Sequence, residues 1–118
     1  MFACFIKYII DPGKIKESEE YAQAWIKLVQ KYGGIHHGYF LPGNDADEFP
    51  KTDFSFPSMA KEGEMNIAVA LFSFSDVETY EAYRKNVAED KDCKVITERL
   101  KASRCFLRYE RSFLRPIF

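Results

Sequence analysis

Two adjacent histidines, His36 and His37, are the residues of this chain best suited to acid–base chemistry. The pKa of a histidine lies near neutrality, so a histidine facing a cleft could move a proton, and its ring nitrogen could also bind a haem iron. Both open a short aromatic stretch that is typical of a β-strand, where neighbouring side chains point to opposite faces. They therefore cannot act together on one site. The alternative is that both make ordinary hydrogen bonds or meet solvent.

Tyr39 lies two residues after His37, so strand alternation predicts that these two side chains share a face. We expect His37 and Tyr39 to line a pocket together, with Tyr8 from an earlier strand as a further member. The candidate catalytic residues are His37, His36 and Tyr39. Each tyrosine could equally be a core ring whose hydroxyl is hydrogen-bonded.

Trp25 and Arg84 could add to a ligand site from helices. Trp25 lies in the middle of an apolar helix face, as part of the core or as a cleft wall. Arg84 follows Tyr80 by four residues and so shares a helix face with it. Arg84 could bind an anionic or enol group of a ligand, or it could pair with Glu81 or Glu110. The candidate ligand-binding residues are thus Tyr8, Tyr39, Trp25 and Arg84.

The three cysteines carry no metal or disulfide pattern. Their number is odd, and no C-x-x-C or Cys/His ligand spacing is present, which predicts reduced thiols and no metal site. The chain has no G-x-G-x-x-G motif and no P-loop, and we expect no cofactor. Cys4 and Cys105 lie in apolar stretches and are expected in the core, whereas Cys93, in a charged stretch, is expected to be exposed. Reduced thiols favour a cytoplasmic protein.

Composition excludes two classes of partner. The 118 residues suit one domain, and 17 Lys and Arg balance 18 Asp and Glu to a net charge of -1. This balance provides no field for binding nucleic acid or an anionic membrane. The apolar run at residues 1–6 is too short to span a bilayer or to form a signal core. We therefore expect no nucleic-acid partner and no membrane span.

Hydrophobic periodicity predicts alternating strands and helices. Gly33-Gly34 ends the first helix, and Ser75 with Glu78 is expected to form a capping box for the second. The predicted strands are 2–10, 35–41, 66–74 and 105–113, and the predicted helices are 15–32, 75–87 and 94–102. A long loop over about 43–63, with Phe49, Phe54 and Phe56, could be a lid or drape over a neighbouring copy.

This order is the β-α-β-β-α-β pattern of an α+β, ferredoxin-like fold with a four-stranded antiparallel sheet. Helices cover one face of such a sheet. Three of the four strands are nevertheless apolar on both faces, whereas a sheet facing water would alternate apolar and polar residues. The second face must also be covered, and a second copy of the chain is the simplest partner. We expect a homodimer through the sheet face.

The chain also resembles a known family. Pro12-Gly13-Lys14 ends a strand, Lys31-Tyr32-Gly33-Gly34 leads into the histidine stretch at 36–42, and the strand at 70–74 continues into Tyr80-Glu81-Ala82-Tyr83-Arg84. Over about residues 2–114 the chain is similar to bacterial NIPSNAP-family proteins of the dimeric α+β barrel superfamily. The resemblance implies a single NIPSNAP-like domain over 1–118. The loop at 43–63 is longer than the usual link.

The resemblance further implies a homodimer with a cleft between sheet and helices in each protomer. Related families include small monooxygenases of polycyclic aromatics, haem-degrading enzymes and isomerases of small lactones, while the NIPSNAP family has no settled catalytic residues. Three hypotheses remain open: a protein that binds a small apolar or aromatic molecule in the cleft, a cofactor-independent monooxygenase-like or isomerase-like enzyme or a haem-binding dimer, and a non-catalytic structural module. The sequence leaves open whether the chain is an enzyme.

Overall fold

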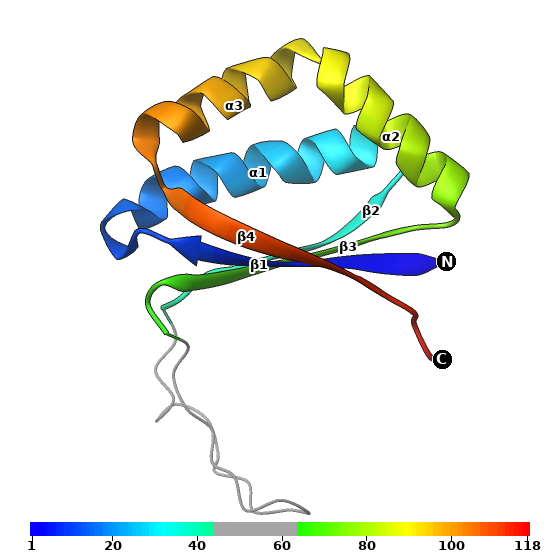
Figure 1. Cartoon of the computed structure of the whole chain (residues 1–118), viewed down its shortest axis with the longest axis horizontal. Coiled ribbons are helices and arrows are strands. Elements are labelled where there is room, and N and C mark those ends of the chain that lie inside the picture. Colours follow the sequence, from blue (N-terminus) through cyan, green and yellow to red (C-terminus); the bar gives the residue numbers. More distant parts are fainter. Residues whose placement is uncertain (44–63) are drawn as a thin grey trace, which may run out of the picture.

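The computed structural model describes residues 1–43 and 64–118, so the predicted loop at 43–63 lies almost wholly outside the described residues. Figure 1 shows a layer of helices above one sheet. The elements are β1 (Phe2–Ile10), η1 (Pro12–Lys14), α1 (Ile15–Lys31), β2 (Ile35–Phe40), β3 (Ile67–Phe74), α2 (Val77–Glu89), α3 (Lys91–Ser103) and β4 (Phe106–Leu114). The α+β, ferredoxin-like order predicted from sequence is confirmed, and the two helices predicted before the last strand are α2 and α3.

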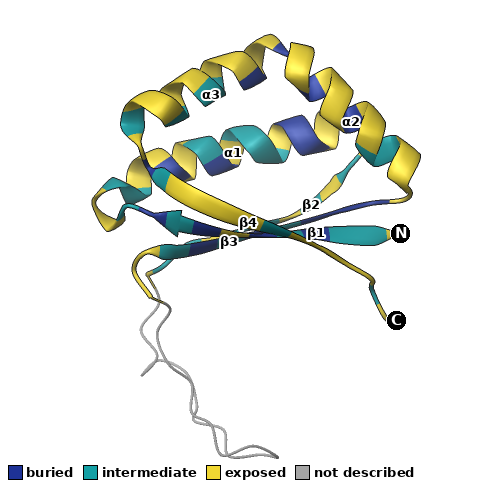
Figure 2. Cartoon of the chain, in the orientation of Figure 1, coloured by how far each residue is buried: buried dark blue, intermediate teal, exposed yellow. Residues whose placement is uncertain are grey.

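The sheet has the strand order β2-β3-β1-β4, and every neighbouring pair is antiparallel. β1 and β3 are the central strands, with Cys4 opposite Phe72 and Tyr8 opposite Ala68. On its other side β1 pairs with β4, where Ile6 faces Arg111. Figure 2 shows burial concentrated on the central strands, while β4 at the edge is largely exposed.

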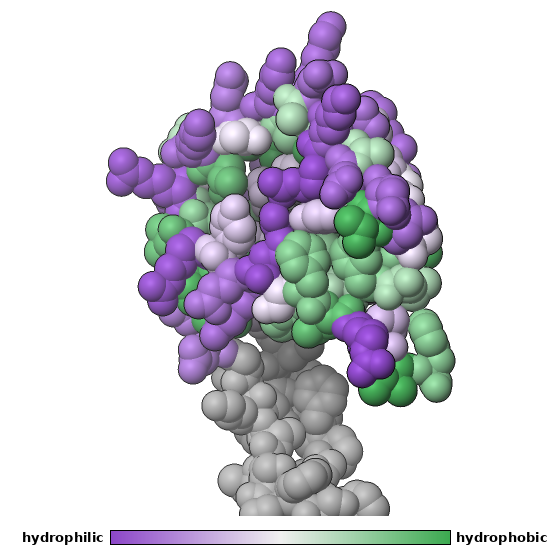
Figure 3. Space-filling view, turned by 45° about the vertical axis from the view of Figure 1, so that its right-hand side comes forward, coloured by the Kyte–Doolittle hydropathy of each residue, from purple (hydrophilic) through white to green (hydrophobic). Residues whose placement is uncertain are grey.

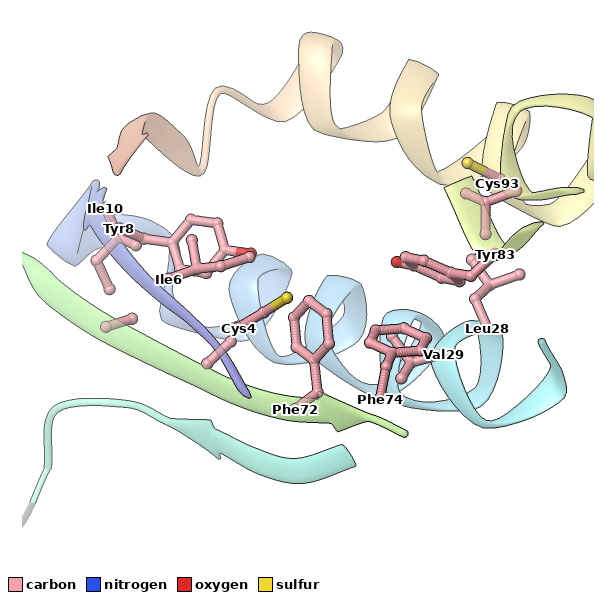
Figure 4. Close-up of a cluster of buried hydrophobic side chains, with 13 residues drawn as sticks. Cys4, Ile6, Tyr8, Ile10, Leu28, Val29, Phe72, Phe74, Tyr83 and Cys93 are labelled. Atoms are coloured by element: carbon pink, nitrogen blue, oxygen red, sulfur yellow. The ribbon is translucent and has the colours of Figure 1, made fainter. Parts of the chain in front are cut away.

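The core lies between the sheet and the helices. Alternate residues of β1 and β3 are buried on this side because strand side chains point alternately to the two faces. α1 contributes Leu28 and Val29, and α2 contributes Tyr83 (Figure 4). Val87 of α2 also belongs to this core. The buried strand residues are Cys4, Ile6, Tyr8, Ile10, Ala68, Ala70, Phe72 and Phe74.

Gly33 and Gly34 end α1 as predicted, each for its own reason. Gly33 has φ +94°, a conformation that costs a residue with a Cβ atom. A Cβ on Gly34 would lie 2.6 Å from Val29 Cγ1 and 2.9 Å from the Phe74 ring. The chain can therefore turn from α1 directly onto the sheet edge, with its backbone against the core.

The capping residue predicted for α2 was wrong by one position. Asp76, not Ser75, has the extended backbone of an N-cap, and its Oδ1 accepts a hydrogen bond from the Thr79 backbone N–H at 2.7 Å. Ser75 Oγ instead donates to Asp76 Oδ2 at 3.1 Å. An aspartate is as good a cap as a serine, so the hydrogen-bond geometry decided between adjacent candidates.

Asp90 links α1 to the start of α3, and α3 begins three residues earlier than predicted. Its Oδ1 accepts hydrogen bonds from the backbone N–H groups of Asp92 and Cys93, while its Oδ2 accepts from Lys31 Nζ at 3.0 Å and from the Tyr32 hydroxyl. The hydrogen bonds from Tyr32 and Lys31 lower the pKa of Asp90. This carboxylate therefore ties the end of α1 to the junction of α2 and α3.

The cysteines are free and buried. Cys4 and Cys105 lie in the core, as expected. Cys93 was expected to be exposed but is only 9% exposed, because it lies in the first turn of α3 on the side that packs against the core. Burial raises the pKa of Cys4 to about 11.

No described element covers the face of the sheet opposite the helices (Figure 1). This face is largely apolar on β1, β2 and β3, whereas β4 brings Arg108, Glu110 and Ser112 to it. Among its side chains, Ile35 is 56% exposed, Phe40 57% and Leu114 47%. Seen from the side in Figure 3, hydrophilic side chains crowd the helical layer and hydrophobic side chains gather at the level of the sheet. The other apolar members of this face, by strand register, are Ala3, Phe5, Ile9, Ile67, Val69 and Leu71.

No helix within residues 1–43 and 64–118 combines the length and the apolar character needed to cross a bilayer.

Candidate functional site

A cavity of about 240 Å³ lies between the sheet and the helices. Its walls come from β1, β2, β3, β4 and all three α-helices, so only the assembled tertiary structure forms it. Arg84 and Ala88 of α2 are exposed and line it, which places its opening beside α2. The lining residues are Ile6, Tyr8, Tyr21, Trp25, Val29, Tyr39, Phe72, Tyr83, Arg84, Val87, Ala88, Cys93, Thr97 and Arg111.

The cavity brings together all four residues that the sequence analysis selected for ligand binding: Tyr8, Tyr39, Trp25 and Arg84. Tyr8 and Tyr39 stack with ring centroids 5.9 Å apart, and their hydroxyl oxygens are 3.5 Å apart. Figure 4 shows the Tyr8 hydroxyl pointing across the space toward that of Tyr83. Aromatic rings with a few convergent polar groups are typical of small-molecule sites.

The tyrosine hydroxyls of this cavity stay protonated at neutral pH. Burial raises the pKa of Tyr8 to about 12, and burial also raises the pKa of Tyr39, Tyr21 and Tyr83. A protonated hydroxyl can donate a hydrogen bond to a ligand oxygen. These groups are therefore suited to hold a ligand by its acceptor atoms.

The predicted pair of His37 and Tyr39 was wrong, because a bulge changes the alternation of β2. The register of β2 against β3 shifts between His36 and Gly38, and Gly38 has φ +119°. An extra residue in a strand reverses the facing of the residues after it. His36 consequently shares the helix-side face with Tyr39, and their rings stack with centroids 5.0 Å apart and planes 16° apart.

His36 is a neutral imidazole. Its Nδ1 accepts a hydrogen bond from the Gly38 backbone N–H at 2.9 Å, so the proton of the neutral ring is on Nε2. The ring also stacks on Phe72 with centroids 5.3 Å apart. Burial, and then the nearby His37, lowers the pKa of His36 to about 4. Its Nε2 is buried and has no partner among the described residues.

His37 lies on the opposite, open face of the sheet. Its Nε2 is 2.9 Å from the hydroxyl oxygen of Ser73, a buried residue of β3. The side chain of His37 itself is exposed. The two histidines thus occupy opposite faces, as the sequence predicted, and it is His36 that shares the face of Tyr39.

Arg111 was not predicted and is the most informative residue of the cavity. It lies on β4 opposite Ile6, so its side chain points to the helix side of the sheet. Its Nε is buried and has no hydrogen-bond partner among the described residues, as is also true of the Trp25 indole Nε1. The alternation of side chains along the last strand could have placed Arg111 on the helix side of the sheet from sequence alone.

Arg84 does not form the ion pair that the sequence analysis considered as the alternative to ligand binding. Within the described residues, the ion pair present is Lys31 with Asp90, and neither Glu81 nor Glu110 pairs with Arg84. The positive charges of Arg111 and Arg84 act on the Tyr83 hydroxyl and lower its pKa, against the larger rise that burial causes. Both guanidinium groups therefore act on the same cavity.

A wider groove of about 610 Å³ runs between α1 and α3. Its charged lining residues, Glu17, Glu20 and Arg99, are exposed. Solvated charges of this kind gain little from a ligand. We place the candidate site in the smaller cavity, where polar atoms without partners and aromatic walls meet.

Comparison with known proteins agrees with the fold and names the family. The NIPSNAP family model matches residues 51–118, which is more than half of the chain. The chain therefore belongs to the NIPSNAP family. A comparison with curated proteins gives no match.

Solved structures show the same fold at low sequence identity. An uncharacterized NIPSNAP domain protein from Burkholderia xenovorans has a TM-score of 0.69 and 20% identity, covering 99% of this chain and 95% of that one. A NIPSNAP family protein of unknown function from Agrobacterium tumefaciens has a TM-score of 0.69 and 16% identity, covering 98% and 87%. A provisionally named antibiotic biosynthesis monooxygenase from Nitrosomonas europaea has a TM-score of 0.64 and 6% identity, covering 100% of both chains.

Proposed function

We propose that this NIPSNAP protein is a one-domain homodimer that binds a small, largely apolar molecule in the cavity between its sheet and its helices. The observation that carries the proposal is the convergence of Tyr8, Tyr39, Trp25 and Arg84, from four different elements, on one cavity of about 240 Å³. Core side chains normally fill such a space to crystal-like density. A space lined by rings and by polar atoms without partners favours a ligand.

The dimer is supported by the open face of the sheet. Fully burying one large apolar side chain is worth about 1.5–3 kcal/mol, and Ile35, Phe40 and Leu114 are all about half exposed on this face. The face also carries Lys7 opposite Glu110 on neighbouring strands. A two-fold axis can bring opposite charges of two copies together, because each copy supplies both. A second copy of the chain is therefore the partner that the face fits.

Native mass spectrometry of the purified protein tests the assembly. We expect a dimer at micromolar concentration, and a monomer would contradict that part of the proposal. A dimer that carries additional mass would also supply the ligand for identification.

Fluorescence of Trp25, the one tryptophan of the chain, tests the binding. We expect titration with benzamide, a neutral one-ring compound, to change the emission of Trp25 because the indole lines the cavity. Ala88→Phe should abolish this change by filling the opening beside α2. Ala82→Phe places the same ring on an exposed part of α2 outside the lining and should leave binding unchanged. Equal responses of both variants would place the binding elsewhere.

A further inference from the structure

We propose that the cavity selects a single-ring aromatic carboxylate, whose carboxylate is held by Arg111 and Arg84 and whose ring lies among the aromatic walls. This inference rests on the proposed function, namely that a small molecule binds in this cavity. It adds the charge and the shape of that molecule.

The two arginines supply positive charge that the described residues do not neutralise. Arg111 and Arg84 both line the cavity, and the described lining residues include no carboxylate. The Arg111 guanidinium carbon lies 5.7 Å from the centroid of the Tyr109 ring, a cation–π contact that leaves its N–H groups free for hydrogen bonds. Its Nε is buried and lacks a partner among the described residues. An unpaired buried donor of a charged group is costly, and an anionic ligand offsets that cost.

The remaining polar atoms of the lining also favour a ligand that carries hydrogen-bond acceptor atoms. Trp25 Nε1 is only a donor, and it too is buried without a partner in the described part of the chain. The Tyr8 and Tyr39 hydroxyls are protonated, since burial raises the pKa of both. Guanidinium, indole and phenol donors together match a carboxylate, which has about four acceptor sites and no proton to donate.

Two arginines in one cavity act at the same place, as their effect on a third group shows. Burial raises the pKa of Cys4, while the charges of Arg111 and then Arg84 lower it. Both arginines also act on the Tyr83 hydroxyl. Arg111 of β4 and Arg84 of α2, which both line the cavity, therefore act on the same two groups.

The walls and the volume set the size of the rest of the ligand. A dry cavity of about 150 Å³ accommodates benzene, so about 240 Å³ accommodates one ring with a short substituent. The walls are flat rings on several sides, because Tyr8 and Tyr39 stack, and Tyr21 lies 6.0 Å from Trp25 between ring centroids. Offset and edge contacts with such rings favour an aromatic ligand over an aliphatic one of equal volume.

The test compares benzoate with benzamide, which has the same shape and no charge, on the dimeric protein, with Trp25 emission as the readout. We expect benzoate to bind about 10- to 100-fold more tightly, the range that a charge-assisted hydrogen bond provides. Arg111→Met and Arg84→Met should each reduce this preference while benzamide binding persists. The matched control is Arg115→Met, which removes an equal charge just beyond β4 and outside the lining, and should keep the preference.

The outcomes separate this inference from the proposed function. If benzamide and benzoate bind equally, the charge selection is overturned and a small-molecule site remains. If neither compound binds, both the selection and the site are overturned. If benzoate is preferred but Arg111→Met and Arg84→Met keep that preference, the assignment to these two arginines is overturned. Circular dichroism of each variant confirms that it is folded, and Arg111→Lys, which keeps the charge, should retain part of the preference.

Discussion

His36 and Tyr39 stack their rings with centroids 5.0 Å apart and planes 16° apart, although they are three residues apart on one strand. Regular alternation would place them on opposite faces. The bulge at Gly38 brings them to the same face, against Phe72 and the core. A single irregular residue therefore decides which histidine is buried beside the cavity residue Tyr39 and which one meets the open face.

We predict that His36 lowers the free energy of unfolding as the pH falls from 6.5 to 4. Its pKa in the folded chain, about 4, is lower than the ordinary 6.5, so the unfolded chain binds the proton more readily in this range. The stabilisation is fully present above pH 6.5 and is lost as the pH falls to about 4, by no more than about 3 kcal/mol. Urea unfolding of the protein and of His36→Phe from pH 4 to 7 measures this, and His36→Phe should show a shallower slope.

The matched variant for that experiment is His37→Phe. His37 is exposed and lies on the other face, so its replacement should leave most of the pH slope in place. Equal slopes for the protein and His36→Phe would show that His36 is not the group responsible.

Gly38→Ala is predicted to destabilise the fold by about 1–3 kcal/mol, the usual cost of a strained backbone conformation. The cost comes from the positive φ of +119°, since among the described residues a Cβ at this position would meet the Phe40 ring alone, at 3.8 Å. Urea denaturation measures the change. A variant of unchanged stability would mean that β2 can pair with β3 in another register.

Asp90→Asn should weaken the fold at neutral pH and reduce its acid sensitivity. The pKa of Asp90 is lowered from 3.8 by hydrogen bonds from Tyr32 and Lys31, so its stabilisation is present above about pH 3.8 and is lost as the pH falls through the lower folded value. Thermal unfolding from pH 2 to 7 measures both effects. Glu89→Gln, at the exposed neighbouring residue, is the control and should behave like the unmodified protein. Identical curves for the two variants would rule out Asp90 as the tie between the helices.

Leu71→Glu is predicted to prevent dimer formation. Leu71 lies in the middle of β3 on the face opposite the helices, next to Phe5 in the register. Burying an unpaired carboxylate in an interface costs several kcal/mol, which the apolar contacts of the face cannot offset. Sedimentation velocity should show a monomer for Leu71→Glu and a dimer for Val95→Glu, which places the charge on the exposed surface of α3. A dimer in both cases would exclude this face as the interface.

The pattern of strands and helices was predictable because it depends on local periodicity. The predicted helix at 15–32 matches α1 within one residue, and Gly33 ends it with positive φ as expected. Boundaries that depend on a choice among hydrogen bonds were less predictable, as Asp76 and Asp90 show. Asp90 begins α3 because its carboxylate can satisfy two backbone N–H groups at once, and this requires the turn that tertiary packing provides.

The sequence by itself determined the fold class and the four strands with their apolar residues, because alternation and helical period are properties of the local chain. It also offered Tyr8, Tyr39, Trp25 and Arg84 as candidate ligand-binding residues. Only the tertiary structure decided that these residues meet in one cavity, that Arg111 joins them, and that His36 rather than His37 stacks on Tyr39. The physical reason is that a bulge and a strand register are settled by pairing between distant segments, where β2 meets β3 and β1 meets β4. These pairings cannot be predicted from the local sequence pattern.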